Sequence, residues 1–195
     1  MASTDRILEA ARGEFAQHGF GGARLQDIAA RAQLSHPTLL YHFGSKEGLY
    51  AAVIEQAMQD WAAMTSLAIA DGKAGFDRVA SLIDAGFAFF ATHHDFVVIW
   101  RREAIEGGGR LEQAMADHMR PFFSQAVEFL RQEIAAGRLR EHDPVELMQL
   151  TYGAVMSFFS DAGFRARLLD EEPFSDEGRF RSALTATLRD ALAPR

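Results

Sequence analysis

Hydroxyl, imidazole and phenol side chains are concentrated between residues 35 and 42 of this chain. They are Ser35, His36, Thr38, Tyr41 and His42. Such groups exchange hydrogen bonds with phosphate oxygens and base edges, and a threonine methyl group contacts the methyl group of thymine. No serine in the chain has the strand-to-helix setting of a hydrolase nucleophile. This segment therefore indicates recognition of nucleic acid rather than covalent catalysis.

A short helix must position these side chains, and its neighbours predict one. Ser35 is a good N-cap, and Pro37 is tolerated in a first turn because no backbone donor is needed there. Leu39 and Phe43, together with Leu40, supply a face for burial, which leaves the polar side chains pointing outward. The start of such a helix also presents free backbone N–H groups to phosphate.

Another short helix precedes the polar helix in the sequence, and a tight connection at Gln33-Leu34 joins the two. Its apolar stripe has the helical spacing i, i+3, i+4, i+7 and consists of Leu25, Ile28, Ala29 and Ala32. Lys46, just past the polar helix, offers a mobile point charge to a nucleic-acid backbone. The pattern is thus helix, turn, helix, with a cation behind it.

Four runs in the first quarter of the chain carry a family resemblance. They are ILEAA at 7–11, FAQHGF at 15–20, DIAARA at 27–32 and SHPTLLYHFGSKEGL at 35–49. Together they resemble the DNA-binding region of TetR-family regulators. The resemblance implies that Thr38, Tyr41, His42 and Lys46 contact DNA, and that Ser35, His36 and Pro37 lead into the same helix.

Three residues depart from the family pattern. Arg24 stands where a capping threonine or serine is usual, and its guanidinium reaches phosphate but cannot cap. Gln33 replaces the usual glycine of the turn, so a residue less suited to positive φ must be accommodated there. Leu40 occupies a common tyrosine position, which removes one phosphate-binding hydroxyl. We expect these changes to alter single contacts rather than the fold.

The whole chain reads as an all-α protein of about nine helices. We expect Gly19 to end the first helix, Asp95 to cap the sixth, and Pro121 to kink or split a long seventh from about residue 111 to 136. Asp143 and Pro144 should open the eighth, and a loop near 170–173 should precede the ninth. We assign 1–48 to a three-helix DNA-binding domain and 49–195 to a helical ligand-binding and dimerisation domain.

The second domain is rich in large apolar side chains, which have two interpretations. One is a packed core or dimer contact, the usual role of apolar stripes. The other is a pocket for an apolar or aromatic effector, lined by hydrophobic groups and a few polar ones. The candidate ligand-binding residues are Phe87, Phe90, Trp100, Arg101, His118, Met119, Phe122, Tyr152 and Met156.

The last long helices look suited to a two-fold dimer. Small residues near Gly153 permit close approach, and a stripe from Ala183 to Ala191 supplies a second surface. A homodimer would place two recognition helices one DNA turn apart, roughly 34–36 Å, on a palindromic operator. By resemblance to the family, the dimer represses transcription until a small-molecule effector releases it.

Composition and charge limit the alternatives. The net charge is −7, but residues 1–50 hold five basic and five acidic side chains, so the acidity lies in the rest. No cysteine, signal-like N-terminus or long apolar run is present, and we expect a cytoplasmic protein without cofactor, metal or membrane contact. An enzyme with zinc at His93 and His94, and a helical adaptor for proteins, are the rival classes. Arg12 and Arg31 read as ordinary surface charges.

Overall fold

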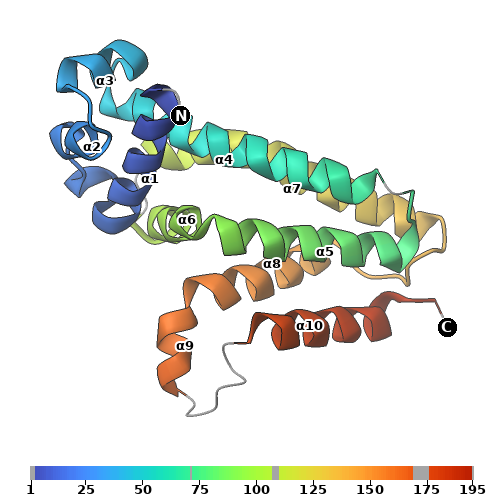
Figure 1. Ribbon diagram of the computed structural model, residues 1–195. Coiled ribbons are helices and arrows are strands. Elements are labelled where there is room, and N and C mark those ends of the chain that lie inside the picture. Colours follow the sequence, from blue (N-terminus) through green and yellow to red (C-terminus); the bar gives the residue numbers. More distant parts are fainter. Residues whose placement is uncertain (1–2, 71, 107–109, 169–175, 195) are drawn as a thin grey trace. The chain divides into compact units, whose positions relative to one another are not determined.

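The computed structural model confirms the predicted all-α class (Figure 1). It describes residues 3–70, 72–106, 110–168 and 176–194. Ten helices lie within these ranges, one more than predicted. The chain divides into two compact units, which are Met1–Asp60 with His93–His118, and Trp61–Thr92 with Met119–Arg195. The functional boundary placed after residue 48 stays a prediction.

The first unit is built on the apolar face of its N-terminal helix. Its helices are α1 (Ser3–Gly22), α2 (Leu25–Arg31), α3 (His36–Phe43), the first part of α4 (Lys46–Ile69), α6 (His94–Glu106) and the start of α7 (Arg110–Ala135). Ile7, Ala11 and Phe15 recur every four residues on α1, and all three are fully buried. The Phe15 ring meets Tyr50 of α4 edge to face, with 4.9 Å between centroids. Since α1 also packs on α2 and α6, the short helices share one core.

The second unit is built around an aromatic cluster. Its helices are α5 (Gly75–Thr92), α8 (Pro144–Ser160), α9 (Ala162–Leu168), α10 (Glu177–Leu192), the end of α4 and most of α7. Phe87 of α5 is fully buried, and its ring centroid lies 5.7–6.1 Å from the rings of Phe158, Phe159 and Phe180. α5 therefore packs on both α8 and α10.

A buried carboxylate joins the end of α7 to the start of α5. Glu133 accepts a hydrogen bond from the Gly75 N–H at 2.7 Å and two from the Arg138 guanidinium at 2.7 and 2.8 Å. The hydrogen bonds from Arg138 and then from Gly75 keep the pKa of Glu133 below its usual value, although burial opposes this. The charged form of Glu133 is therefore the one that the fold stabilises.

The additional helix, α9, covers a stretch to which the sequence analysis assigned no structure. The guanidinium of Arg165 donates hydrogen bonds to the carbonyls of Ser157 at 3.1 Å and Phe158 at 2.6 Å. It also lies over the Phe158 ring, 4.4 Å from the centroid. These contacts cap α8 and hold the next turn as a helix. The loop predicted near 170–173 lies outside the described residues.

Helix ends were predicted with mixed success. Asp143 caps α8 as expected, accepting from the N–H groups of Val145 at 2.8 Å and Glu146 at 3.0 Å. Of the kink or split predicted at Pro121, the split does not occur, because α7 continues across the proline, which removes only one hydrogen bond from a long helix. The three glycines at 107–109, which the sequence predicts to end the sixth helix, lie outside the described part of the chain.

Two further expectations about helix ends need correction. Asp95 does not cap α6: the helix begins at His94, and the Asp95 carboxylate faces Arg12 at 3.6 Å instead. Gly19 has the expected positive φ of 67°, but its ψ of 174° interrupts α1, which makes one more turn to Gly22. Within the described ranges no single helix is long and apolar enough to cross a bilayer, and only the bent pair α5 and α6 passes such a test when counted together.

Candidate nucleic-acid interface

The turn between α2 and α3 closes with the hydrogen bonds of a Schellman motif. The Leu34 N–H donates to the Ala29 carbonyl at 2.9 Å, and the Gln33 N–H donates to the Ala30 carbonyl at 3.0 Å. This pattern needs a left-handed residue after the helix, and Gln33 has a φ of 57°. The prediction that a glutamine is accommodated where glycine is usual is confirmed.

The start of α3 is fixed by a pair of hydroxyl groups. The Ser35 Oγ accepts a hydrogen bond from the Thr38 N–H at 3.2 Å, as an N-cap does. The same oxygen lies 2.7 Å from the Thr38 Oγ1, and either hydroxyl can donate in this pair. Pro37 occupies the first turn, where its missing donor costs nothing. The predicted cap is therefore confirmed, and both hydroxyl oxygens are held in place.

One flank of α3 faces solvent while the other is seated on the core. Leu39 is fully buried, whereas the Tyr41 side chain is 86% exposed and His42 is also exposed. The two rings meet edge to face with 5.5 Å between centroids. His36 and Thr38 are half-buried at the same flank. A solvent-facing aromatic beside imidazole and hydroxyl groups offers both stacking and hydrogen bonding to a partner.

The apolar side chains of α3 are less buried than predicted. Phe43, which was expected to be buried with Leu39, is half-buried, and Leu40 is half-buried as well. Phe43 is the last residue of α3, directly before Gly44, where φ is 73° and the chain leaves the helix. A side chain at that end covers the core only in part.

Gly48 lets α4 begin close to the end of α3, which the sequence analysis missed. A Cβ atom on Gly48 would lie far inside contact distance of the Phe43 carbonyl oxygen. Ser45 caps α4, accepting from the Gly48 N–H at 3.0 Å. A side-chain pattern carries no information on how near another backbone comes, so only the glycine itself was available as a signal.

The two cations assigned to phosphate differ in their surroundings. Arg24 is exposed at the N-cap position of α2, and its side chain makes no capping hydrogen bond, as predicted. Lys46 is not the mobile charge that the sequence suggests. Its Nζ lies 4.7 Å from the centroid of the Phe20 ring and donates to the Gly21 carbonyl at 3.4 Å. These contacts hold the ammonium group at the end of α1.

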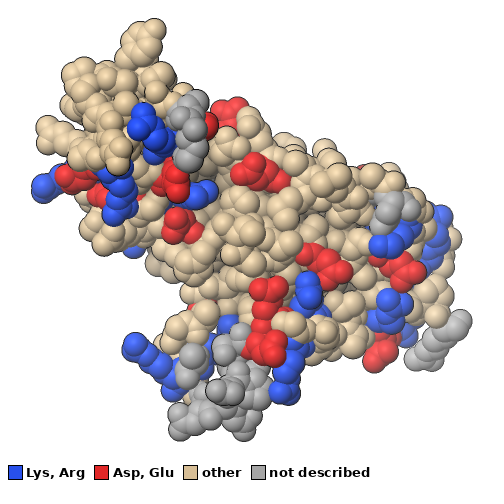
Figure 2. Space-filling model, viewed as in Figure 1, with Lys and Arg blue, Asp and Glu red and all other residues tan. Residues whose placement is uncertain are grey.

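Several of the remaining charges of the first unit are paired with neighbouring side chains. Arg31 lies 3.9 Å from the buried Glu14, and Arg12 lies 3.6 Å from Asp95. Their side chains are 53% and 36% exposed, so both are surface charges, as expected, that also take part in ion pairs. On the face shown in Figure 2, basic and acidic side chains alternate near α1 and α2 instead of forming one basic patch. A nucleic acid that binds the exposed flank of α3 would therefore have to be held by a few individually placed groups.

The candidate ligand-binding residues fall in both units. The second unit contains the buried Phe87, Phe90 and Met156 and the half-buried Met119, Phe122 and Tyr152. The first unit contains the half-buried Trp100 and Arg101, and the side chain of His118 lies outside the described residues. Their assignment to a ligand stays a prediction.

Comparison with known proteins identifies a family match in the N-terminal segment that contains α2 and α3. Residues 7–53 match the bacterial regulatory proteins of the tetR family. The chain is 30% identical over 139 residues to the HTH-type transcriptional repressor NicS of Pseudomonas putida. That match covers 70% of this chain and 63% of NicS, so the chain spans less than two thirds of this relative. The names are those of regulators and not of enzymes.

Solved structures share the fold over nearly the full chain. The regulator SCO4942 of Streptomyces coelicolor superposes with a TM-score of 0.77 at 24% identity, covering 98% of each chain. The regulator FadR of Bacillus subtilis, in complex with stearoyl-CoA, gives a TM-score of 0.76 at 17% identity and covers 95% of each chain. The helical arrangement beyond the matched N-terminal segment is therefore also that of known regulators.

Proposed function

Since the chain belongs to the TetR family of bacterial regulatory proteins, we propose that it is a cytoplasmic transcriptional repressor that binds operator DNA as a homodimer. The observation that carries the proposal is the exposed flank of α3, where Tyr41 is 86% exposed while Leu39 on the opposite side is fully buried. A short helix seated in this way can enter a major groove with its polar side outward.

Each polar group has a role in this proposal. Thr38, Tyr41 and His42 contact base edges from the middle and end of α3. Ser35, His36 and Pro37 bring the start of the helix, with its free N–H groups, to a phosphate. Arg24 and Lys46 neutralise phosphates on either side. The exposure of Arg24 supports its part directly, whereas Lys46 would have to reach DNA from its place over Phe20.

A homodimer follows from the need for two reading helices. The exposed surface of α8 supports it: the side chains of Val145 and Leu150 are 56% and 69% exposed, and Gly153 nearby is exposed. Apolar groups of this size gain from being covered by a second copy. A two-fold axis there would set the half-sites of a palindrome roughly 34–36 Å apart.

The effector that we propose is an apolar molecule bound within the second unit. The half-buried Met119 and Phe122 of α7 lie on the same helix as Phe123, whose ring is 5.4 Å from Tyr152 of α8. FadR, which shares the fold, was solved with stearoyl-CoA, so this compound is the first probe. Binding should raise the melting temperature of the full chain and release DNA, and Tyr152→Ala should weaken both effects.

Selection of bound fragments from a random DNA pool tests the function itself. The full chain should enrich a palindrome with half-sites about one helical turn apart. Tyr41→Ala should weaken binding to that palindrome or relax its sequence, whereas Phe164→Ala, which removes a 67% exposed ring from the second unit, should not. If no sequence is enriched by a folded, dimeric protein, the proposal is wrong.

A further inference from the structure

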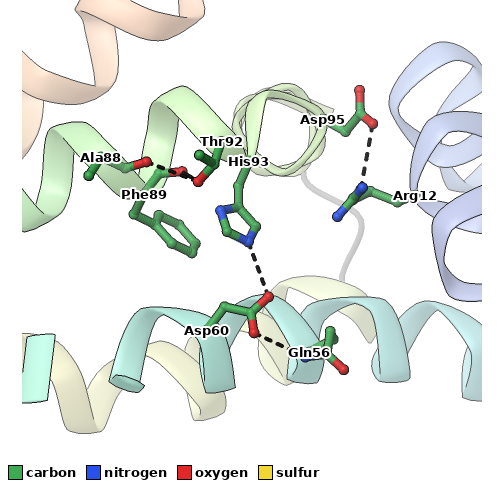
Figure 3. A network of polar contacts seen from close by, with 8 residues as sticks. All are labelled: Arg12, Gln56, Asp60, Ala88, Phe89, Thr92, His93 and Asp95. Atoms are coloured by element: carbon green, nitrogen blue, oxygen red, sulfur yellow. Dashed lines mark hydrogen bonds and ion pairs between the residues drawn. The ribbon is translucent and has the colours of Figure 1, made fainter. Parts of the chain in front are cut away.

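Helix α6 makes polar contacts with α1 at two points within the first unit. Near its start, the Asp95 carboxylate lies 3.6 Å from the Arg12 guanidinium, with side chains 43% and 36% exposed (Figure 3). Two turns later, the Arg102 guanidinium donates to the Ala16 carbonyl at 3.4 Å and the Gln17 carbonyl at 3.5 Å. The two contacts are spaced along both helices, so together they resist sliding and rotation of α1.

The second contact is at the interruption of α1. Ala16 and Gln17 belong to the last regular turn before the interruption of α1 at Gly19. The carbonyl groups in the last turn of a regular helix have no partner within that helix. A cation placed there satisfies these carbonyls and favours the negative end of the helix dipole. A Cβ atom on Gly19 would lie 2.9 Å from Arg102 atoms, so the guanidinium side chain is packed directly against the bend. Arg102 thus fixes the point from which the chain turns toward α2.

The same corner of α6 is also joined to α4. His93, directly before α6, lies 3.1 Å from the Asp60 carboxylate, and its side chain is only 12% exposed (Figure 3). Asp60 also accepts from Gln56 one turn earlier on α4, at 3.1 Å. His93 is therefore a largely buried link between the start of α6 and α4. One segment, 93–102, thus contacts both α1, on which the neighbour of α3, α2, packs, and α4, which follows α3 in the chain.

We propose that Asp95 and Arg102 are positioning residues for DNA binding, which hold α1 in the orientation that presents the exposed flank of α3. The inference rests on the proposed function, because it concerns the affinity for DNA. Neither residue touches DNA in this proposal. Each acts on α1 alone, Asp95 through Arg12 and Arg102 through the carbonyls beside Gly19.

Asp95→Asn gives the sharpest test because electrostatics and positioning predict opposite signs. Removing a negative charge from the DNA-binding unit should tighten binding if charge alone matters. Loss of the contact with Arg12 should weaken binding, roughly threefold to tenfold, since exposed ion pairs are individually weak and both protomers lose one. The measurement is the dissociation constant for the selected palindrome at several salt concentrations, using the full chain.

Two further variants and one control complete the test. The exchange Arg12→Asp with Asp95→Arg preserves net charge and should recover most of the affinity lost by either single change. Arg102→Gln should weaken binding without changing the slope of affinity against salt, because no phosphate contact is lost. Asp84→Asn removes the same charge from an exposed ion pair with Arg181 at 3.7 Å in the second unit, and it should leave binding unchanged.

The outcomes separate the two proposals. If the unaltered chain binds no DNA, the proposed function fails. If it binds DNA and Asp95→Asn binds equally well or better, or if Arg102→Gln lowers the salt slope by about one unit, the positioning roles are wrong. Thermal unfolding of each variant identifies any variant that has lost its fold. If a single variant is unfolded, the DNA affinity of the double variant Arg12→Asp with Asp95→Arg decides the question instead.

Discussion

The helices of both compact units are joined by polar and aromatic contacts, but among the described residues the second unit has the larger aromatic cluster. In the first unit, cationic side chains bind backbone carbonyls, as Lys46 binds Gly21 and Arg102 binds Ala16 and Gln17. In the second, aromatic rings stack on one another, as Phe158 does on Phe180 with 4.7 Å between centroids. Polar contacts of this kind are exchanged at small cost, whereas aromatic packing depends on shape. We therefore expect the first unit, with its smaller aromatic cluster, to readjust more easily than the second.

The largest test of this contrast is Phe87→Ala in the second unit. Phe87 is fully buried among three other rings, so the free energy of unfolding should fall by about 3–5 kcal/mol. Each unit contains one of the two tryptophans, Trp61 in the second and Trp100 in the first. Denaturant unfolding followed by Trp61 fluorescence, in a Trp100→Phe background, reports the loss. Phe164→Ala should change stability by less than about 0.5 kcal/mol.

The corresponding change in the first unit is Gly48→Ala. The added Cβ must move the Phe43 carbonyl, which should cost about 1–3 kcal/mol and displace α3 from α4. Fluorescence of Trp100 in a Trp61→Phe background should report the loss of stability, and affinity for the selected palindrome should fall with it. Gly163→Ala, where a Cβ meets nothing within 4 Å, is the matched control. Equal behaviour of the two variants would contradict the close approach of α3 and α4.

Glu133→Gln tests a buried polar contact of the second unit. The folded state lowers the pKa of Glu133, chiefly through Arg138, so its contribution is complete above the unfolded value near 4.3 and is lost as the pH falls through the folded value. The variant should be less stable at pH 7 by about 1–2 kcal/mol. The difference from the parent should shrink below about pH 4. A constant difference from pH 7 to pH 3 would show that charge is not involved.

The smallest expected effects come from exchanging two residues with the same backbone role. Gly137 ends α7 with the same hydrogen bonds as Gln33 ends α2, at φ values of 68° and 57°. Gln33→Gly should stabilise the first unit by roughly 0.5 kcal/mol, since relief of strain exceeds the entropy that glycine costs. Gly137→Gln should destabilise the second by about 1 kcal/mol, because its surroundings are open and only strain is added. Shifts of the same sign would be inconsistent with this account.

Local chemistry made much of the fold predictable from the sequence. The caps at Ser35 and Asp143 and the positive φ of Gln33 follow from residue types and their neighbours, and the structure has all three. The α3 bounds also agree, because a cap, a proline and a glycine delimit a stretch of only eight residues. Helix identity thus depends on interactions within a few residues of each other.

Contacts between distant parts of the chain were not predictable in this way. Arg102 is 86 residues from Ala16, and Glu133 is 58 residues from Gly75, so no spacing rule connects them. Asp95 looked like a cap because its local signal is correct, but the nearby Arg12 offers its carboxylate a stronger partner. Likewise, exposure of the polar flank of α3 was predictable, whereas the restraint on Lys46 depends on where Phe20 lies.

The paired hydroxyl groups of Ser35 and Thr38 have a consequence for what this surface tolerates. Their oxygens are 2.7 Å apart, so one hydroxyl group donates its proton to the other oxygen, and the proton of the second hydroxyl group stays available to a partner. If Thr38 gives its proton to Ser35, the spare proton is on the serine, and if the direction reverses it is on the threonine. A rotation of two hydroxyl groups therefore relocates an outward donor without moving any heavy atom. A partner with a hydrogen-bond acceptor at either location meets the same rigid arrangement of oxygen atoms. The protein can therefore bind either partner at almost no cost in free energy.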